Sequence, residues 1–213
     1  MFHTIEDTRS AIKLFTHITD GIVYMDLETT GLDPHSDTIL LLSLRHDGQS
    51  SVIVFGKVDL HACIPSLTRL LCNVHVRKVF HNAVFDLKML FHHTQSIAKN
   101  VYCTMVAEQV LKAGIQVGGF GLQDVAYKRL GVLLNKVIRD QFLERVDTTF
   151  TQEELLYSAV DVDVLEPIYA QQQEELEKWT LQRVMTIECE CLPITAHMEY
   201  GGICVNTQLL EDA

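Results

Sequence analysis

The run IVYMDLE at residues 22–28 most constrains what this chain can fold into. Its branched and aromatic side chains predict a strand, and that strand ends in two carboxylates, Asp26 and Glu28. Side chains two apart on a strand point to the same side, so both carboxylates are expected on one face. Like charges repel there unless a cation lies between them, so the pair suits metal binding. Taken alone, an ordinary solvated turn explains such a pair equally well.

Two more strand candidates follow along the chain. Residues 38–46 (TILLLSLRH) and 51–56 (SVIVFG) are rich in branched apolar side chains, and Asp47 and Gly48 between them are a hairpin signal. Apolar spacing becomes helical over residues 60–71, returns to a short strand at 76–80 and is helical again from 83 to about 91. This order predicts an α/β fold, in which a mixed sheet of antiparallel meander plus parallel strand is flanked by helices.

The C-terminal half is predicted to be mostly helical. Residues 101–171 have helical patterns, interrupted by a glycine-rich tract at 117–121 and a charged loop at 135–150. A further helix is predicted over residues 174–197, ending where Gly201 and Gly202 follow Tyr200. We expect a main domain over residues 1–175 and a helical extension over residues 176–213.

Charge and cysteine content limit the class of protein. The 213 residues are 47% hydrophobic with a net charge of −11, so the chain as a whole does not attract a polyanion as a typical duplex-DNA binder does. Its six cysteines form no CxxC pair, which argues against a zinc ribbon or a disulfide framework. The sequence has neither a signal peptide nor the ~18 apolar residues of a membrane helix, so we expect a reduced, cytoplasmic location and no membrane partner.

Two further motifs place a polar residue four positions before an aspartate. Asn82 and Asp86 have this spacing at the start of the helix predicted from residue 83, where Asn82 is also a reasonable cap. Tyr157 and Asp161 share the spacing within another helix, and it favours Asp161 over the neighbouring Asp163. Singly, an ordinary helix start explains the first motif, and packing or a surface contact explains the second.

The three motifs occur in the order DxE, NxxxD and YxxxD. In this combination residues 20–175 resemble the DEDD superfamily of 3′→5′ exonucleases, in its tyrosine-bearing branch, and are most similar to the proofreading domain of family A DNA polymerases. The stretch IECECLPITAHMEYGGICVN is similar to the segment that leads from that domain into the polymerase thumb. The resemblance implies a ribonuclease H-like exonuclease fold, either standalone or covalently linked to a polymerase domain in a longer chain.

The resemblance also assigns catalytic roles. Asp26, Glu28, Asp86 and Asp161 would hold two divalent metal ions, and Tyr157 would orient the attacking water. Because all the ligands offer oxygen, Mg²⁺ or Mn²⁺ is expected rather than zinc.

Other family positions imply substrate contacts. Thr29 and Leu32 match positions that contact the terminal nucleotide, and Asn82 matches one that contacts the substrate or supports the site. Cys103 departs from the family, where an aspartate often stands before the next helix, and this puts helix capping there in doubt. Basic residues that are candidates for a groove along the strand are Arg77, Lys78, Lys88, Arg129, Lys136 and Arg139.

The expected activity is hydrolysis of single-stranded DNA 3′ ends to mononucleotides. An RNA-trimming exonuclease of the same superfamily would carry an identical metal site, so it stays open as an alternative. A catalytically silent DNA-binding module is a second alternative, although a silent relic would not need all four acids and Tyr157. The sequence leaves the oligomeric state open.

Overall fold

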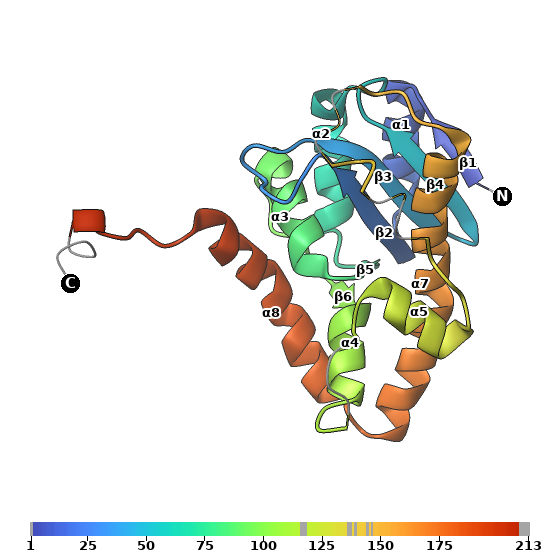
Figure 1. The fold of residues 1–213 in the computed structure, drawn as a ribbon, viewed down its shortest axis with the longest axis vertical. Coiled ribbons are helices and arrows are strands. Elements are labelled where there is room, and N and C mark those ends of the chain that lie inside the picture. The colour runs from blue at the N-terminus through green and yellow to red at the C-terminus, as the bar shows by residue number, and fades with distance from the viewer. Residues whose placement is uncertain are drawn as a thin grey trace.

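The strand that carries Asp26 and Glu28 lies inside a mixed sheet in the computed structural model (Figure 1). The structure describes residues 2–115, 119–135, 138, 140–143, 145 and 147–208. In this part of the chain the elements are β1 (Phe2–Ile5), α1 (Thr8–His17), β2 (Gly21–Thr29), β3 (Ile39–His46), β4 (Gln49–Val54), α2 (Leu60–Cys72), β5 (Val76–Phe80), α3 (Ala83–Thr94), β6 (Val101–Cys103), α4 (Thr104–Leu111), α5 (Leu122–Leu130), α7 (Gln152–Lys178) and α8 (Gln182–Gly201).

The described strands form one sheet in the order β1-β4-β3-β2-β5-β6. β2, β3 and β4 pair antiparallel and β5 joins β2 in parallel, so the predicted α/β class and the meander with an added parallel strand are confirmed. The two edge strands, β1 and β6, were not predicted. They have four and three residues, too few for a periodic pattern to reveal them.

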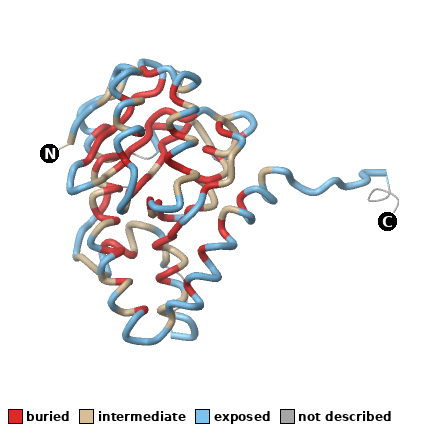
Figure 2. The backbone as a smooth tube through the Cα atoms, turned by 180° about the vertical axis from the view of Figure 1, so that it is seen from behind, coloured by how far each residue is buried: buried red, intermediate tan, exposed pale blue. Residues whose placement is uncertain are grey.

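Helices cover both faces of the sheet. Ile53 of β4 packs in one core cluster with Phe15 of α1 and Leu67 of α2. Its neighbour Val52 belongs to a second cluster with Leu155 of α7. The alternation of side chains along β4 therefore separates a face covered by α1 and α2 from a face covered by α7. Figure 2 shows that buried residues concentrate in the sheet and on the helix sides that face it.

The last two helices are separated by a sharp break. α7 ends at Lys178, Thr180 takes a left-handed backbone with φ 57°, and α8 begins at Gln182. The helix predicted from residue 174 is therefore interrupted at residues 179–181, a break that no glycine or proline marks, but it ends at the two glycines as predicted. α8 packs against α3, α4 and β6, and residues 202–208 beyond it are exposed (Figure 2). None of the helices in the described ranges is long and apolar enough to cross a bilayer.

Candidate active site

β2 brings Asp26 and Glu28 to the face of the sheet that α7 covers. Tyr24, two residues before Asp26, packs edge-on against Tyr169 of α7 with ring centroids 6.1 Å apart. Glu28 is buried and Asp26 is half-buried. The register with β3 shifts between Glu28 and Thr29, so regular pairing is interrupted directly after the two carboxylates.

α7 supplies a third carboxylate to the same place. One side-chain oxygen each from Asp26, Glu28 and Asp161 lies within 4.8 Å of the other two. Ser158 also reaches the group, since its Oγ donates a hydrogen bond to Glu28 Oε1 at 3.4 Å. Ser158 was not predicted, because a serine beside a motif tyrosine has no distinguishing sequence pattern.

Tyr157 lies beside this carboxylate cluster, defined as Asp26, Glu28 and Asp161. Burial raises the pKa of the Tyr157 phenol well above its ordinary value. The three negative charges and a hydrogen bond to Asp161 raise it further. The ring lies near Phe142, with centroids 6.3 Å apart. The phenol therefore stays protonated at neutral pH and can donate a hydrogen bond, but cannot act as a base.

The start of α7 is held in place by a reciprocal cap. The Thr151 side chain accepts from the Glu154 backbone N–H, while Glu154 accepts from the Thr151 backbone N–H. Arg145 also binds Glu154 and donates to the Thr149 carbonyl oxygen. These contacts fix the first turn of the helix, one turn before Tyr157.

Asp86 approaches from α3 at the edge of the carboxylate cluster. Its side chain is buried, and Oδ1 accepts a hydrogen bond from the Leu27 backbone N–H at 3.2 Å. Burial, followed by the negative charge of Asp26, raises its pKa well above the ordinary range. Asp86 is therefore next to Asp26 but is not part of the compact group of three.

The residues predicted to contact substrate differ in their surroundings. Leu32 is 65% exposed in the loop after β2, so its side chain is available to a ligand. The buried Thr29 donates its hydroxyl hydrogen to the Gly31 carbonyl at 2.7 Å. Asn82 is exposed and occupies the N-cap of α3, as predicted, with φ 61°, but its side chain makes no cap hydrogen bond.

Asp163 points away from the carboxylate cluster, as its spacing predicts. It pairs with Arg45 of β3 at 3.2 Å and accepts a hydrogen bond from Ser50 of β4. Two residues along a helix rotate a side chain to a different face, which separates Asp163 from Asp161.

The junction between β6 and α4 is closed without the family's aspartate. Cys103 occupies the N-cap of α4 but makes no side-chain cap hydrogen bond. Its sulfur instead accepts from the Ala83 backbone N–H at the start of α3, at 3.5 Å. Thr104 Oγ1 lies 2.8 Å from His81 Nδ1. The prediction that Cys103 does not cap the helix that follows it, α4, is therefore confirmed.

Most of the basic residues proposed for a substrate groove are engaged elsewhere. Lys78 is fully buried, and its ammonium group donates to the Asn73 and Val76 carbonyl oxygens at 2.7 and 2.9 Å. That burial lowers the pKa of Lys78 to about 8. The Arg129 side chain is buried and pairs with Glu108 and Glu175. Lys88 pairs with Glu199 at 2.8 Å. The assignment of Lys78 and Arg129 to a groove was wrong, since charge alone ignores partners. Lys136 and Arg139 lie outside the described residues.

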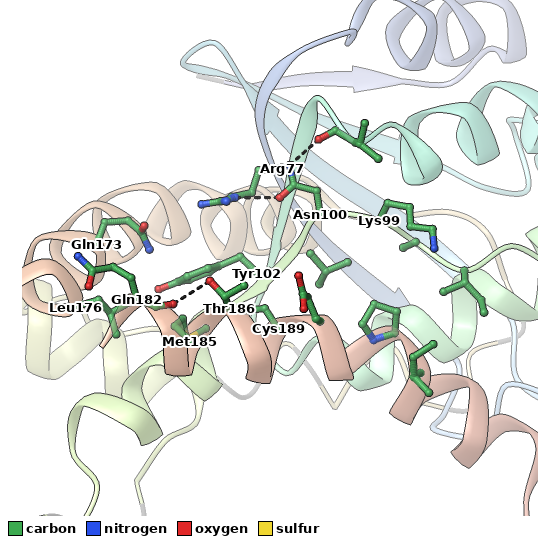
Figure 3. Close-up of a pocket in the computed structure, with 17 residues that line it drawn as sticks. Arg77, Lys99, Asn100, Tyr102, Gln173, Leu176, Gln182, Met185, Thr186 and Cys189 are labelled. Carbon is green, nitrogen blue, oxygen red and sulfur yellow. Dashed lines mark hydrogen bonds between the residues drawn. The ribbon is translucent and has the colours of Figure 1, made fainter. Parts of the chain in front are cut away.

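A separate hollow of about 580 Å³ lies between α8, the end of α7 and β6 (Figure 3). On one side Arg77 donates to Asn100 Oδ1 at 3.2 Å, and on the other Thr186 donates to the Gln182 carbonyl at 2.8 Å. Tyr102 of β6 lies between them. Arg77, a candidate for the substrate groove, lines this hollow, but none of the residues predicted to bind metal, to orient the water or to contact the terminal nucleotide does, and all of those are described. The hollow is therefore distinct from the carboxylate cluster.

The donor chemistry of the carboxylate cluster fits a hard divalent cation. Its three ligand groups are all carboxylate oxygens, the type that Mg²⁺ and Mn²⁺ prefer. Three negative groups this close destabilise a folded chain unless a positive charge offsets them. A shared cation explains why Asp26, Glu28 and Asp161 can lie together.

Solved structures share this fold over nearly the whole chain. A structure described as the apo form of a nuclease has a TM-score of 0.78 at 24% identity, covering 94% of this chain and 93% of its own. NrnC from Brucella melitensis with bound Mg²⁺ has a TM-score of 0.75 at 24% identity, covering 94% and 93%. Escherichia coli RNase D has a TM-score of 0.78 at 17% identity, covering 93% of this chain and 51% of its own.

The sequence itself also matches a known family. Residues 1–177 match the family described as 3′-5′ exonuclease, whereas no curated protein matches the chain. With the carboxylate cluster, this match identifies the cofactors as two divalent metal ions, Mg²⁺ or Mn²⁺. As the order of its acidic motifs predicts, the chain belongs to the 3′-5′ exonuclease family.

Proposed function

We propose that the chain removes mononucleotides from the 3′ end of single-stranded DNA. In this proposal Asp26, Glu28, Asp86 and Asp161 hold the metal ions and Tyr157 aims the attacking water. The observation that carries it is the convergence of three carboxylates from β2 and α7, with the Tyr157 phenol hydrogen-bonded to Asp161. The chemistry supplied by two bound divalent ions is activation of a water molecule and stabilisation of charge on the leaving 3′ oxygen.

Tyr157 contributes orientation. Its raised pKa keeps the hydroxyl protonated, so the group donates a hydrogen bond and holds one water orientation. The first turn of α7, which precedes Tyr157, is fixed by the Thr151 and Glu154 cap. The Tyr157 ring lies near Phe142, so the hydroxyl is held in one position. Fixing a reactant in this way lowers the entropic part of a barrier.

A single-stranded 3′ terminus is the substrate form that the loop after β2 favours. Leu32 is 65% exposed there, three residues beyond Thr29 and four beyond Glu28, so an apolar contact is offered beside the carboxylates. An unpaired terminal base presents its flat face to such a side chain, whereas a paired base is already stacked in its duplex.

Two observations favour DNA as the substrate. The matching family is named for the exonuclease of DNA polymerase A. Residues 187–206 resemble the segment that leads into the thumb of those polymerases. On this proposal residues 1–175 are the exonuclease domain, residues 176–213 are a helical extension, and the protein acts in the reduced cytoplasm.

RNA is a second candidate, because the structural neighbours favour it. The E. coli RNase D structure is described as an exoribonuclease involved in structured RNA processing, and an NrnC structure was solved bound to pGG. Since a ribose 2′-hydroxyl distinguishes RNA from DNA, the choice depends on whether a contact near Thr29 and Leu32 accommodates that group.

The test is hydrolysis of two single strands of the same sequence, one DNA and one RNA, each labelled at its 5′ end. We expect kcat/KM for DNA to exceed that for RNA, with products shortening stepwise from the 3′ end. A faster reaction on RNA would replace DNA by the second candidate. Products that begin at the 5′ end, or cleavage of a circular single strand, would contradict exonuclease polarity.

A further inference from the structure

The last turn of α8 contacts the loop that carries Leu32. Tyr200, near the end of α8, lies against His35 with ring centroids 4.4 Å apart. His35 Nε2 is 3.0 Å from the Tyr200 carbonyl oxygen. The two residues are separated by 165 positions, so this contact joins the C-terminal helix to the segment that follows β2.

The same turn is fastened to α3, which carries Asp86. The Tyr200 hydroxyl is 3.2 Å from His92 Nδ1, and its ring lies 5.0 Å from that of Phe91. Beside it, Lys88 donates to Glu199 at 2.8 Å, with the lysine side chain only 21% exposed. Tyr200 therefore sits between two segments, one leading from Glu28 and the other carrying Asp86.

The loop itself is cross-linked around Asp37. Asp37 Oδ1 accepts from the Thr30 hydroxyl at 3.1 Å, and Oδ2 accepts from the Asp33 backbone N–H at 2.9 Å. Thr30 Oγ1 in turn accepts from the Thr38 backbone N–H at 2.9 Å. A Cβ at Gly31 would lie 2.5 Å from the Asp37 carboxylate, so the chain packs tightly on it. Such a loop shifts as a unit, and a contact at His35 also restrains Leu32.

We propose that Tyr200 is a positioning residue for substrate binding: by clamping His35 against α3, it holds the Leu32 loop where the 3′-terminal nucleotide enters. This inference rests on the proposed function, since it takes Leu32 to contact the substrate. Tyr200 touches no reacting atom in this account. Its loss should weaken capture of the 3′ end and leave the chemical step unchanged.

The test compares Tyr200→Ala and Tyr200→Phe with wild type on a labelled single strand at saturating Mg²⁺. Tyr200→Ala removes the ring contacts to His35 and Phe91, so KM should rise about three- to tenfold while kcat stays within about twofold. Tyr200→Phe keeps the ring contacts and loses only the hydroxyl beside His92, so it should retain most of the wild-type affinity. The backbone carbonyl that faces His35 is present in both variants. Tyr127→Ala, an exposed tyrosine on α5, is the matched control and should leave both constants unchanged.

His35→Ala supplies the second half of the test. It removes the loop side of the same contact, and it remains informative if Tyr200→Ala does not fold. If the two residues act through one contact, the double variant should raise KM no more than the larger single effect. Additive effects, an unchanged KM in Tyr200→Ala, or a loss confined to kcat would overturn the inference. A wild-type protein inactive on every strand would instead overturn the proposed function.

Discussion

Replacing Asp161 by asparagine should stabilise the metal-free protein while removing its activity. Asparagine keeps an oxygen that can accept from Tyr157 but removes one negative charge from the carboxylate cluster. Oxygens of the three acids lie within 4.8 Å of one another. At that separation, two unit charges repel by about 3.5 kcal/mol if the effective dielectric constant is about 20. Asp161 faces two such partners, Asp26 and Glu28.

The net gain is smaller than the sum of these repulsions. Asp26 is half-buried, so water screens it, and buried acids also relieve repulsion by taking up protons. We therefore expect Asp161→Asn to gain about 1–3 kcal/mol in free energy of unfolding, which is a rise in Tm of about 2–12 °C for a chain of this size. The measurement is thermal unfolding in excess chelator at neutral pH.

Adding Mg²⁺ should raise the Tm of wild type above that of Asp161→Asn. Ligand binding stabilises the folded state by about 2.7 kcal/mol at one hundred times the Kd, so wild type should gain more than the variant. Asp163→Asn is the matched control, because Asp163 lies on the same helix but pairs with Arg45. It should not raise Tm in chelator, and it should keep the wild-type response to Mg²⁺. A lower Tm for Asp161→Asn in chelator, or an unchanged Mg²⁺ response, would show that Asp161 neither repels the other two carboxylates nor binds the metal.

Three further predictions follow from the same geometry. Tyr157→Phe should lower kcat by about one to three orders of magnitude with an unchanged Mg²⁺ dependence, because orientation is lost and ligands are not; full rescue by added metal would contradict this. Because the pKa of Asp86 is raised in the folded state, the free energy of unfolding of metal-free wild type should fall as pH rises from about 4 through the pKa of Asp86 in the folded state. In Asp86→Asn this fall should be smaller, as chemical unfolding at a series of pH values would show. Leu32→Ala should raise KM for a single strand about three- to tenfold without lowering Tm, since the side chain is 65% exposed, and an unchanged KM would remove Leu32 from the substrate contact.

Local signals explain what the sequence predicted of the fold. The meander from β2 to β4 follows from branched strand residues and the hairpin signal at Asp47 and Gly48, all within about thirty positions. β1 could not be found in this way, because its pairing with β4 is parallel and joins residues near 2 to residues near 50. The break at Thr180 was missed because a non-glycine residue adopts φ 57° there, which no local pattern marks.

The candidate site was predictable to the extent that spacing fixes direction. Asp26 and Glu28 share a face because strands alternate, and the turn between Tyr157 and Asp161 brings both to that face. Ser158 had no such signal, since its contact with Glu28 depends on how α7 crosses the sheet. Lys78 was misassigned because its charge alone does not show that the tertiary structure buries its side chain completely. Its ammonium group turns back to backbone carbonyl oxygens only five and two positions earlier in the chain.

If the carboxylate cluster is a metal-dependent nuclease site, shortening of a strand from its 3′ end must depend on a divalent ion. A single-stranded DNA labelled at its 5′ end is incubated with wild type, Asp161→Asn and Asp163→Asn, each in Mg²⁺ and in excess chelator. We expect a ladder that shortens from the 3′ end only in Mg²⁺, in wild type and Asp163→Asn but not in Asp161→Asn. Shortening in chelator, or wild-type rates in Asp161→Asn, would contradict the assignment of the carboxylate cluster as a metal-dependent nuclease site.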